Sequence, residues 1–134
     1  TGATNLEEAC CIIHDRGALI AGVTDGANGS YFVWPDGTAY RCQPFPQASV
    51  VDTTGAGDSF HGAFLSKLAV SIRQENTLYG EFIKPIDILQ SLDHKQLESA
   101  AIFASAVSAL NTQGIGGRSA LPSLKSACNL AGLE

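Results

Sequence analysis

The chain of 134 residues lacks the features that mark several classes of protein. No apolar run approaches the length of a membrane-spanning helix, and no basic segment followed by an apolar one marks a signal peptide. Positive charge is scarce, because eight Lys and Arg face thirteen Asp and Glu, which gives a net charge of −5. These absences argue against a membrane protein, a secreted protein, and a nucleic-acid or anionic membrane partner.

Metal-binding and disulfide patterns are also missing. The four cysteines form no C-x-x-C pair and have no accompanying His cluster, so zinc is not expected. Apolar neighbours predict buried thiols in a reducing, cytoplasmic compartment. The chain has no methionine and starts with a helix rather than a strand, so we expect it to be part of a larger protein. The cysteines are Cys10, Cys11, Cys42 and Cys128.

The first third of the chain predicts one helix and three strands. Thr4 and Glu7 have the spacing of a capping box, with Thr4 as N-cap of a helix that reaches about Ile13. The first apolar run is continuous, which is typical of a strand covered on both faces, and a Pro-Asp-Gly turn joins the other two strands. The strands are expected at residues 18–23, 31–34 and 38–42.

The rest of the chain predicts helices around a surface connection at residues 73–84. The helix at 94–111 is expected to be the longest, and its Ala and Ser content allows close packing against a sheet or a flat ligand. Together the elements indicate a layered α/β sheet, with too few strands for a complete doubly wound domain. The helices are expected at residues 57–70, after Pro85, at 94–111 and at 122–133.

One stretch places an acid beside a glycine-containing helix start. Small residues at 55–57 leave backbone N–H groups uncovered, and with the positive end of the helix dipole these groups form a cradle for an anion. A phosphate there would repel Asp58, so we interpret Asp58 as a base that takes a proton while the amides receive a phosphoryl group. The alternative is an ordinary strand-to-helix turn in which Asp58 stabilises the helix start.

Spacing excludes two common phosphate loops. A P-loop needs Gly, four residues and then Gly-Lys-Ser/Thr, and the chain contains no such run. In a dinucleotide fingerprint, Gly55 and Gly57 fit the first two glycines, but Phe60 stands where the last glycine belongs.

Three segments resemble the ribokinase-like (PfkB) carbohydrate kinases. Residues 52–65 are similar to the C-terminal signature of that family, and they read Asp-Thr-Thr-Gly-Ala-Gly-Asp-Ser-Phe-His-Gly-Ala-Phe-Leu. Residues 23–29 are similar to its nucleotide-binding Thr-x-Gly-x-x-Gly loop, and residues 103–122 to its C-terminal helix and loop. The resemblance therefore implies that residues 1–134 are a single nucleotide-binding and catalytic portion, the C-terminal half of a ribokinase-like layered α/β fold. It also implies that the family's lid and sugar-contacting acid lie in an N-terminal half that these residues do not include.

The resemblance implies an ATP-dependent carbohydrate kinase that transfers the γ-phosphoryl group to a sugar hydroxyl. Asp58 corresponds to the general base, and the anion hole is formed by Gly55, Ala56 and Gly57. Mg²⁺ is expected on the nucleotide phosphates. The resemblance also places a nucleotide at Thr24, Gly26, Gly29, Gly57 and Ser105. A monovalent cation such as K⁺ would lie at Asp52, Thr54 and the carbonyls of Asn111, Gly114 and Gly116.

Several of these residues also have plainer interpretations. The segment 24–29 fits a simple loop leading into a hairpin, Ser105 fits a small helix-packing residue, and Asp52 fits a cap that accepts from the Thr54 N–H. His61 is interpreted as a packing residue, and His14 and His94 as solvated.

The function also has alternatives: a nucleoside kinase of the same fold, or a non-catalytic nucleotide-binding or assembly module. A homodimer would form through the lid that this chain lacks.

Overall fold

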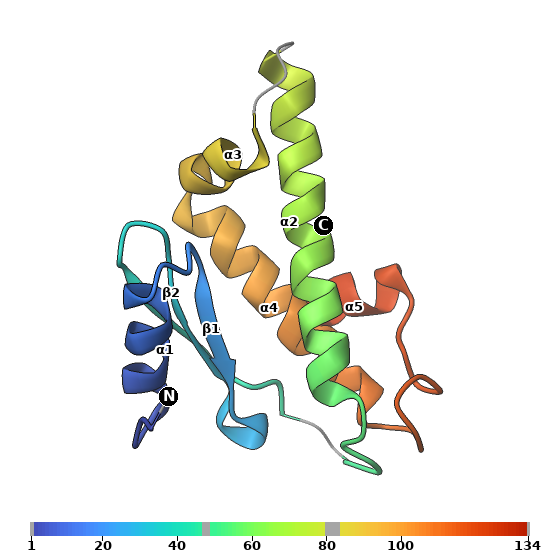
Figure 1. Cartoon of the computed structure of the whole chain (residues 1–134). Helices are drawn as coiled ribbons and strands as arrows, with labels where there is room; N and C mark the ends of the chain where they lie inside the picture. Colours follow the sequence, from blue (N-terminus) through green and yellow to red (C-terminus); the bar gives the residue numbers. More distant parts are fainter. Residues whose placement is uncertain (1, 47–48, 80–83, 134) are drawn as a thin grey trace.

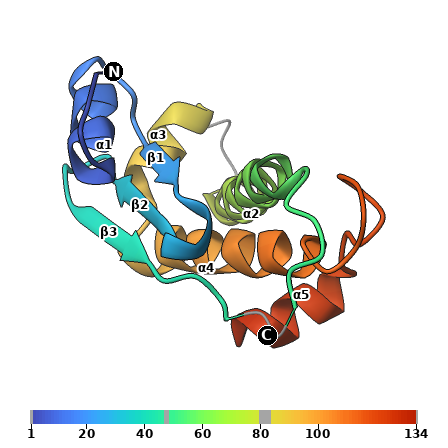
Figure 2. The same cartoon turned by 90° about the horizontal axis from the view of Figure 1, so that it is seen from below.

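The computed structural model describes residues 2–46, 49–79 and 84–133 (Figure 1). One small sheet lies between α1 on one face and the packed helices α2 and α4 on the other (Figures 1 and 2). The mixed α/β architecture is therefore confirmed. In chain order the elements are α1 (Leu6–Asp15), β1 (Ala21–Thr24), a 3₁₀ turn η1 (Gly26–Asn28), β2 (Ser30–Val33), β3 (Ala39–Cys42), α2 (Ala56–Tyr79), α3 (Pro85–Ser91), α4 (His94–Asn111) and α5 (Leu124–Ala131).

The sheet is an antiparallel meander in the order β1-β2-β3. The turn between β2 and β3 is the predicted one, closed by the Trp34 N–H on the Thr38 carbonyl at 2.9 Å, with Gly37 at φ +82°. The first strand differs from its prediction. β1 starts later, at Ala21, and its residues alternate between buried and exposed, so the expectation of a strand covered on both faces is wrong. Among the described residues β1 pairs with β2 alone, and α1 covers one of its faces.

The core is a stack of aromatic rings covered by a helix of small residues. The Phe32 ring centroid lies 4.9 Å from that of Trp34 and 5.1 Å from that of Phe64, so the sheet and α2 meet ring on ring. Such pairs contribute about 0.5–1.5 kcal/mol each beyond their buried area. Trp34 is fully buried. Alanines on α4 let that helix approach α2 closely, and the buried ones are Ala100, Ala101, Ala104 and Ala106.

The first helix is capped one residue later than predicted. Asn5, not Thr4, is the N-cap, and its Oδ1 accepts from the Glu8 N–H at 2.8 Å. The Glu8 carboxylate in turn accepts from the N–H and hydroxyl of Thr4 at 2.8 and 2.9 Å. Both registers satisfy the spacing of the motif, and Glu7 faces Arg41 instead, at 3.9 Å. Local spacing therefore leaves the N-cap residue open, and the cap at Asn5 occurs together with the contact of Glu7 on α1 with Arg41 on β3.

The second helix is longer than its pattern predicted. α2 continues past residue 70 to Tyr79, and residues 73–79 are not a connection. Its 24 residues make it the longest helix in the described part of the chain, so the expectation that the helix at 94–111 is the longest is wrong. No Gly or Pro occurs between residues 63 and 79, and Arg, Gln and Glu are good helix formers. Residues 80–83 of the predicted connection lie outside the described part of the chain.

The remaining helices follow the sequence closely. α4 has the predicted bounds and begins with a capping box in which Asp93 and Gln96 exchange hydrogen bonds. It ends at Asn111 with Thr112 as C-cap, ahead of the glycines at residues 114–117. α3 begins at Pro85, and α5 lies inside the predicted range, with Gly132 at φ +67° after its end.

The cysteines are buried to different degrees. Cys10 and Cys42 are buried, and burial raises the pKa of both thiols. Cys11 is exposed and Cys128 is half-buried, so the prediction of buried thiols is wrong for Cys11. Cys11 sits on the outer face of α1, where the helix period carries it away from the sheet.

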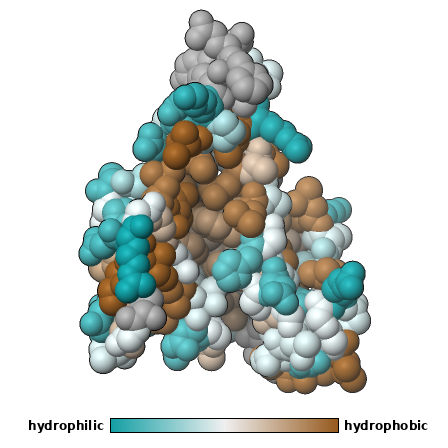
Figure 3. Space-filling view, in the orientation of Figure 1, coloured by the Kyte–Doolittle hydropathy of each residue, from teal (hydrophilic) through white to brown (hydrophobic). Residues whose placement is uncertain are grey.

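Apolar surface gathers in a hollow between the sheet and α2 (Figure 3). Two exposed apolar side chains of α2 are Leu65 and Val70. Contiguous apolar surface of this kind marks a place where another chain segment, partner or ligand packs. No helix within residues 2–46, 49–79 and 84–133 combines the length and apolarity needed to cross a membrane.

His94 has a partner that its sequence position did not reveal. Its Nε2 lies 2.9 Å from the Asp36 carboxylate, so the β2–β3 turn is joined to the start of α4. The Thr38 N–H donates to the same carboxylate at 2.9 Å. The Thr38 amide, and after it His94, lowers the pKa of Asp36 to about 2.

A carboxyl titration of Asp36 by NMR should therefore have its midpoint near 2. Because the folded pKa is depressed, the stabilisation is present above the unfolded pKa of about 3.9 and is lost as the pH falls toward 2. In His94→Ala the midpoint should rise but remain below the ordinary value, because the Thr38 amide is the larger cause. A wild-type midpoint near 4 would contradict the hydrogen bonds at this turn.

Candidate functional site

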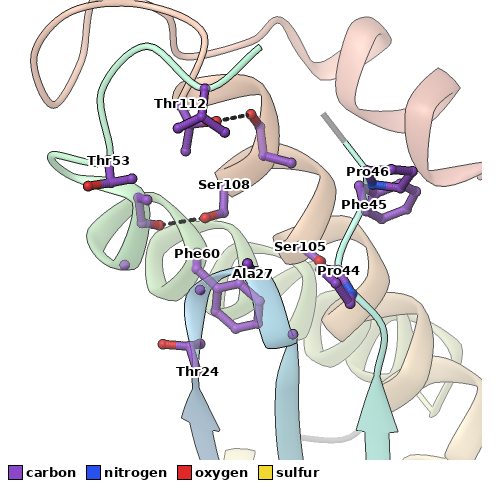
Figure 4. Close-up of a pocket in the computed structure, with 16 residues that line it drawn as sticks. Thr24, Ala27, Pro44, Phe45, Pro46, Thr53, Phe60, Ser105, Ser108 and Thr112 are labelled. Carbon is purple, nitrogen blue, oxygen red and sulfur yellow. Dashed lines mark hydrogen bonds between the residues drawn. The ribbon is translucent and has the colours of Figure 1, made fainter. Parts of the chain in front are cut away.

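A cavity of about 650 Å³ lies where η1, the segment after β3 and the start of α2 meet α4 (Figure 4). Six of the predicted site residues line it: Thr24, Gly26, Gly29, Ala56, Gly57 and Ser105. Segments far apart in the sequence therefore line one continuous cavity. The other lining residues are Ala27, Pro44, Phe45, Pro46, Val50, Thr53, Phe60, Ser108, Ala109 and Thr112.

The loop after β1 is a tight turn that only glycine can close at its last position. Gly29 has φ +86°, and a Cβ there would lie 2.3 Å from the Cys42 carbonyl oxygen of β3. The Asp25 N–H donates to the Gly29 carbonyl at 2.8 Å, and Asn28 donates back to the Asp25 carbonyl and carboxylate. The loop thus lies close against β3, which brings Thr24 and Gly26 to the cavity.

The start of α2 leaves amides free at the positive end of a long helix. The Ala56 N–H donates to the Thr53 carbonyl at 3.1 Å, and the Ser59 N–H to the Gly55 carbonyl at 2.9 Å. Between them, the N–H groups of Gly57 and Asp58 have no hydrogen-bond acceptor among the described residues. Unpaired amides at a helix N-terminus bind anions.

Asp58 lies in the first turn of α2 and is exposed. It follows the lining residues Ala56 and Gly57 but does not itself line the cavity. Within the described part of the chain its carboxylate accepts no hydrogen bond, so it is open to solvent beside the amides.

Asp52 ties the approach to α2 to the loop after α4. Its two carboxylate oxygens accept from the N–H groups of Thr54 and Gly116, each at 2.8 Å. The Gly116 amide, and after it the Thr54 hydroxyl and amide, holds the pKa of Asp52 below its ordinary value. The hydrogen bonds to the ionised Asp52 carboxylate are therefore present at neutral pH, and they weaken only as the pH falls through the depressed pKa. The cap on the Thr54 N–H is confirmed, and Gly116 adds a contact across the fold.

Two glycines bring the same loops into backbone contact. Gly55 has φ +75°, and a Cβ there would lie 2.6 Å from the Gly117 Cα. The Asn111 amide donates to the Gly117 carbonyl at 3.2 Å, while the buried Asn111 Oδ1 has no partner in the described part of the chain. Sequence reasoning missed Gly117 and the Asn111 side chain, although three glycines within residues 114–117 signalled a close approach.

The predicted cation ligands are only partly brought together. Hydrogen bonds gather Asp52, Thr54 and Gly116. Asn111, the last residue of α4, and Gly114, in the loop after it, have no direct hydrogen bond to these three among the described residues. No group of three or more His, Cys, Asp or Glu is placed to hold a metal within the described ranges. A cation here would therefore depend on main-chain carbonyls, which K⁺ accepts as ligands.

Sequence reasoning also missed the wall opposite the amides. Pro44, Phe45 and Pro46 line the cavity on the segment after β3, a role that no sequence pattern indicated. Phe60 adds a buried ring from α2. This wall is apolar, as is common in ligand pockets, and polar groups are few within it.

Comparison with known proteins identifies the family. Residues 1–124 match the model of the pfkB family carbohydrate kinases. The chain belongs to this family. The bifunctional ribokinase/ribose-5-phosphate isomerase A of Fructilactobacillus sanfranciscensis is 31% identical over 116 residues, which are 87% of this chain and 17% of that protein. The aminoimidazole riboside kinase of Salmonella typhimurium is 32% identical over 83 residues, 62% of this chain and 25% of that enzyme.

The fold of this chain is also similar to that of solved structures. A fructokinase double mutant from Vibrio cholerae, bound to fructose, ADP and a potassium ion, superposes with a TM-score of 0.74 at 25% identity. The match covers 98% of this chain and 36% of the fructokinase chain. The chain thus spans about a third or less of the length of these relatives.

In this pfkB family chain, Gly55→Ala should destabilise the fold by roughly 2 kcal/mol or more, because positive φ and a backbone clash act together. Gly62→Ala is the matched control, since Gly62 lies inside α2 with nothing within 4 Å of a Cβ. It should raise stability by about 0.5–1 kcal/mol. Urea unfolding of both variants measures the difference. Equal stability of the two variants would contradict the contact with Gly117.

Proposed function

We propose that this chain supplies the nucleotide-binding and catalytic portion, the C-terminal half, of an ATP-dependent carbohydrate kinase. The observation that carries the proposal is the shared cavity: the loop of Thr24 and Gly26 and the free amide of Gly57 border the same space. Membership of the pfkB family supports the reaction class. The apolar hollow beside α2 is where the rest of such a kinase would pack (Figure 3).

The nucleotide would occupy the cavity of about 650 Å³, a volume within the usual range for ligand pockets. Thr24, Gly26, Gly29 and Ser105 would contact it, and the apolar wall of Pro44 and Phe45 suits the flat face of a base. Mg²⁺, when bound with the nucleotide, would neutralise phosphate charge. The fructokinase relative binds ADP, which accords with this placement.

The chemistry divides between amides and an acid. The acceptor hydroxyl oxygen bonds to the γ-phosphorus, the bond from that phosphorus to ADP breaks, and the hydroxyl proton passes to the Asp58 carboxylate. The turn of Gly55, Ala56 and Gly57 would form the anion hole, and the free Gly57 N–H would donate to the transferring phosphoryl group, since the Ala56 N–H already donates to the Thr53 carbonyl. Removing one such donor typically costs about 2.7–4 kcal/mol of transition-state stabilisation.

A monovalent cation such as K⁺ would sit beside this hole, at Asp52, Thr54, Asn111, Gly114 and Gly116. Support comes from the oxygen-rich cluster around the Asp52 carboxylate and from the potassium ion in the fructokinase relative. The ion would hold the segment before α2 and the loop after α4 at a fixed separation.

A nucleoside kinase is the second candidate. The similarity to aminoimidazole riboside kinase favours it, because that enzyme takes a riboside as its acceptor. An ADP-release assay over a panel of sugars and nucleosides, with the full-length gene product, separates the two. Nucleotide binding without transfer to any acceptor would favour the non-catalytic module instead.

Asp58→Asn in the full-length protein should lower kcat by roughly 10²–10⁴-fold while ADP affinity is retained, because the base is lost and the amides remain. Asp87→Asn is the matched control, since Asp87 is also an exposed acid in the first turn of a helix, α3. Its kcat should equal that of the wild type. Near-normal turnover of Asp58→Asn would disprove the role of the base.

A further inference from the structure

We propose that Ser108 of α4 is a positioning residue for the amide of Gly57. The proposal rests on the proposed function, because that amide is there assigned to the transferring phosphoryl group. Ser108 lines the cavity and is half-buried, and nothing in its sequence context distinguishes it from the other small residues of α4.

The contact joins two helices across the site. The Ser108 hydroxyl donates to the Ala56 carbonyl at 2.9 Å, a bond between residues 52 positions apart (Figure 4). The Ala56 carbonyl and the Gly57 N–H belong to one planar peptide group, in which the two point in opposite directions. Holding the carbonyl from α4 therefore fixes the direction in which the Gly57 N–H points.

Other helical hydroxyls of the molecule behave differently. Ser59, Ser66 and Ser91 each donate to a carbonyl three residues earlier in their own helix. Such local bonds are what Ser hydroxyls in helices commonly form. Ser59 is the instructive case, because it donates at 2.9 Å to the same Ala56 carbonyl but moves with the first turn of α2. Among the described residues, only the Ser108 hydroxyl donates a hydrogen bond from α4 to that first turn.

The hydrogen bond from Ser108 matters because α4 forms the other side of the cavity. Ser105 and Ala109 of α4 line it, so the Ser108 bond sets the separation between the nucleotide wall and the phosphoryl-binding amide. Displacement of a catalytic donor by about 1 Å can lower a rate by up to 10²-fold. The bond also polarises the peptide group, which makes the Gly57 N–H a better donor.

The test compares Ser108→Ala with Ser59→Ala in the full-length gene product. Ser108→Ala should lower kcat by about 3–30-fold and leave the KM for ATP within about twofold, since the amide acts in the transition state. Ser59→Ala should change both constants less than twofold, and Ser108→Thr, which keeps the hydroxyl, should recover most of kcat. Ser108→Cys fills the same space with a weak donor and serves if the alanine variant does not fold.

Two kinetic outcomes would overturn the proposal. An unchanged kcat in Ser108→Ala excludes positioning, and a raised KM for ATP at unchanged kcat assigns Ser108 to direct nucleotide contact instead.

A measurement independent of activity separates this proposal from the proposed function. In protein labelled with ¹⁵N-glycine, the Gly57 amide resonance should shift more in Ser108→Ala than in Ser59→Ala, because both variants remove one bond to the Ala56 carbonyl but only the first releases it from α4. Absence of phosphoryl transfer in the wild type would defeat the proposed function, while the Gly57 resonance would still decide the role of Ser108. An unmoved resonance in Ser108→Ala overturns the positioning role.

Discussion

The contact between the segment before α2 and the loop after α4 is the constraint on which the site depends. Asp52 accepts two amides from opposite sides of this junction, and the Thr112 carbonyl accepts the N–H groups of Val51 and Asp52 at 2.8 and 3.1 Å. Gly55 meets Gly117 backbone to backbone. A side chain at Gly55 would force the loops apart, so the position of the first turn of α2, and with it the free amides, is set here.

Packing of α2 on α4 then fixes the direction of that first turn. Buried alanines on α4 permit a close approach, and the aromatic rings of Phe60 and Phe64 hold α2 against Phe32 of the sheet. The same sheet carries η1 at the end of β1, so one core positions both borders of the cavity. Because the core is shared, a change in helix packing would alter the separation of the loop after β1 and the amides, not only the stability of the fold.

Two carboxylates flank the start of α2 in different environments. Asp52 has both oxygens occupied by amides, which lowers its pKa and suits a structural, permanently charged group. Asp58 is exposed, with no such bond in the described part of the chain, which suits a group that exchanges a proton with an acceptor. The sequence places them six residues apart, and the difference in hydrogen bonding separates holding the loop from the proposed chemistry.

The sequence by itself determined the local features: the bounds of α4, the Pro-Asp-Gly turn and the glycine-acid motif at the start of α2. These depend on neighbouring residues, on caps and on backbone freedom, which a sequence displays directly. Only the tertiary structure decided the cap at Asn5, the length of α2, the pairing of His94 with Asp36, the apolar wall at residues 44–46 and the reach of Ser108 to Ala56. Each of these depends on competing local alternatives or on groups far apart along the chain, and their proximity is created by folding.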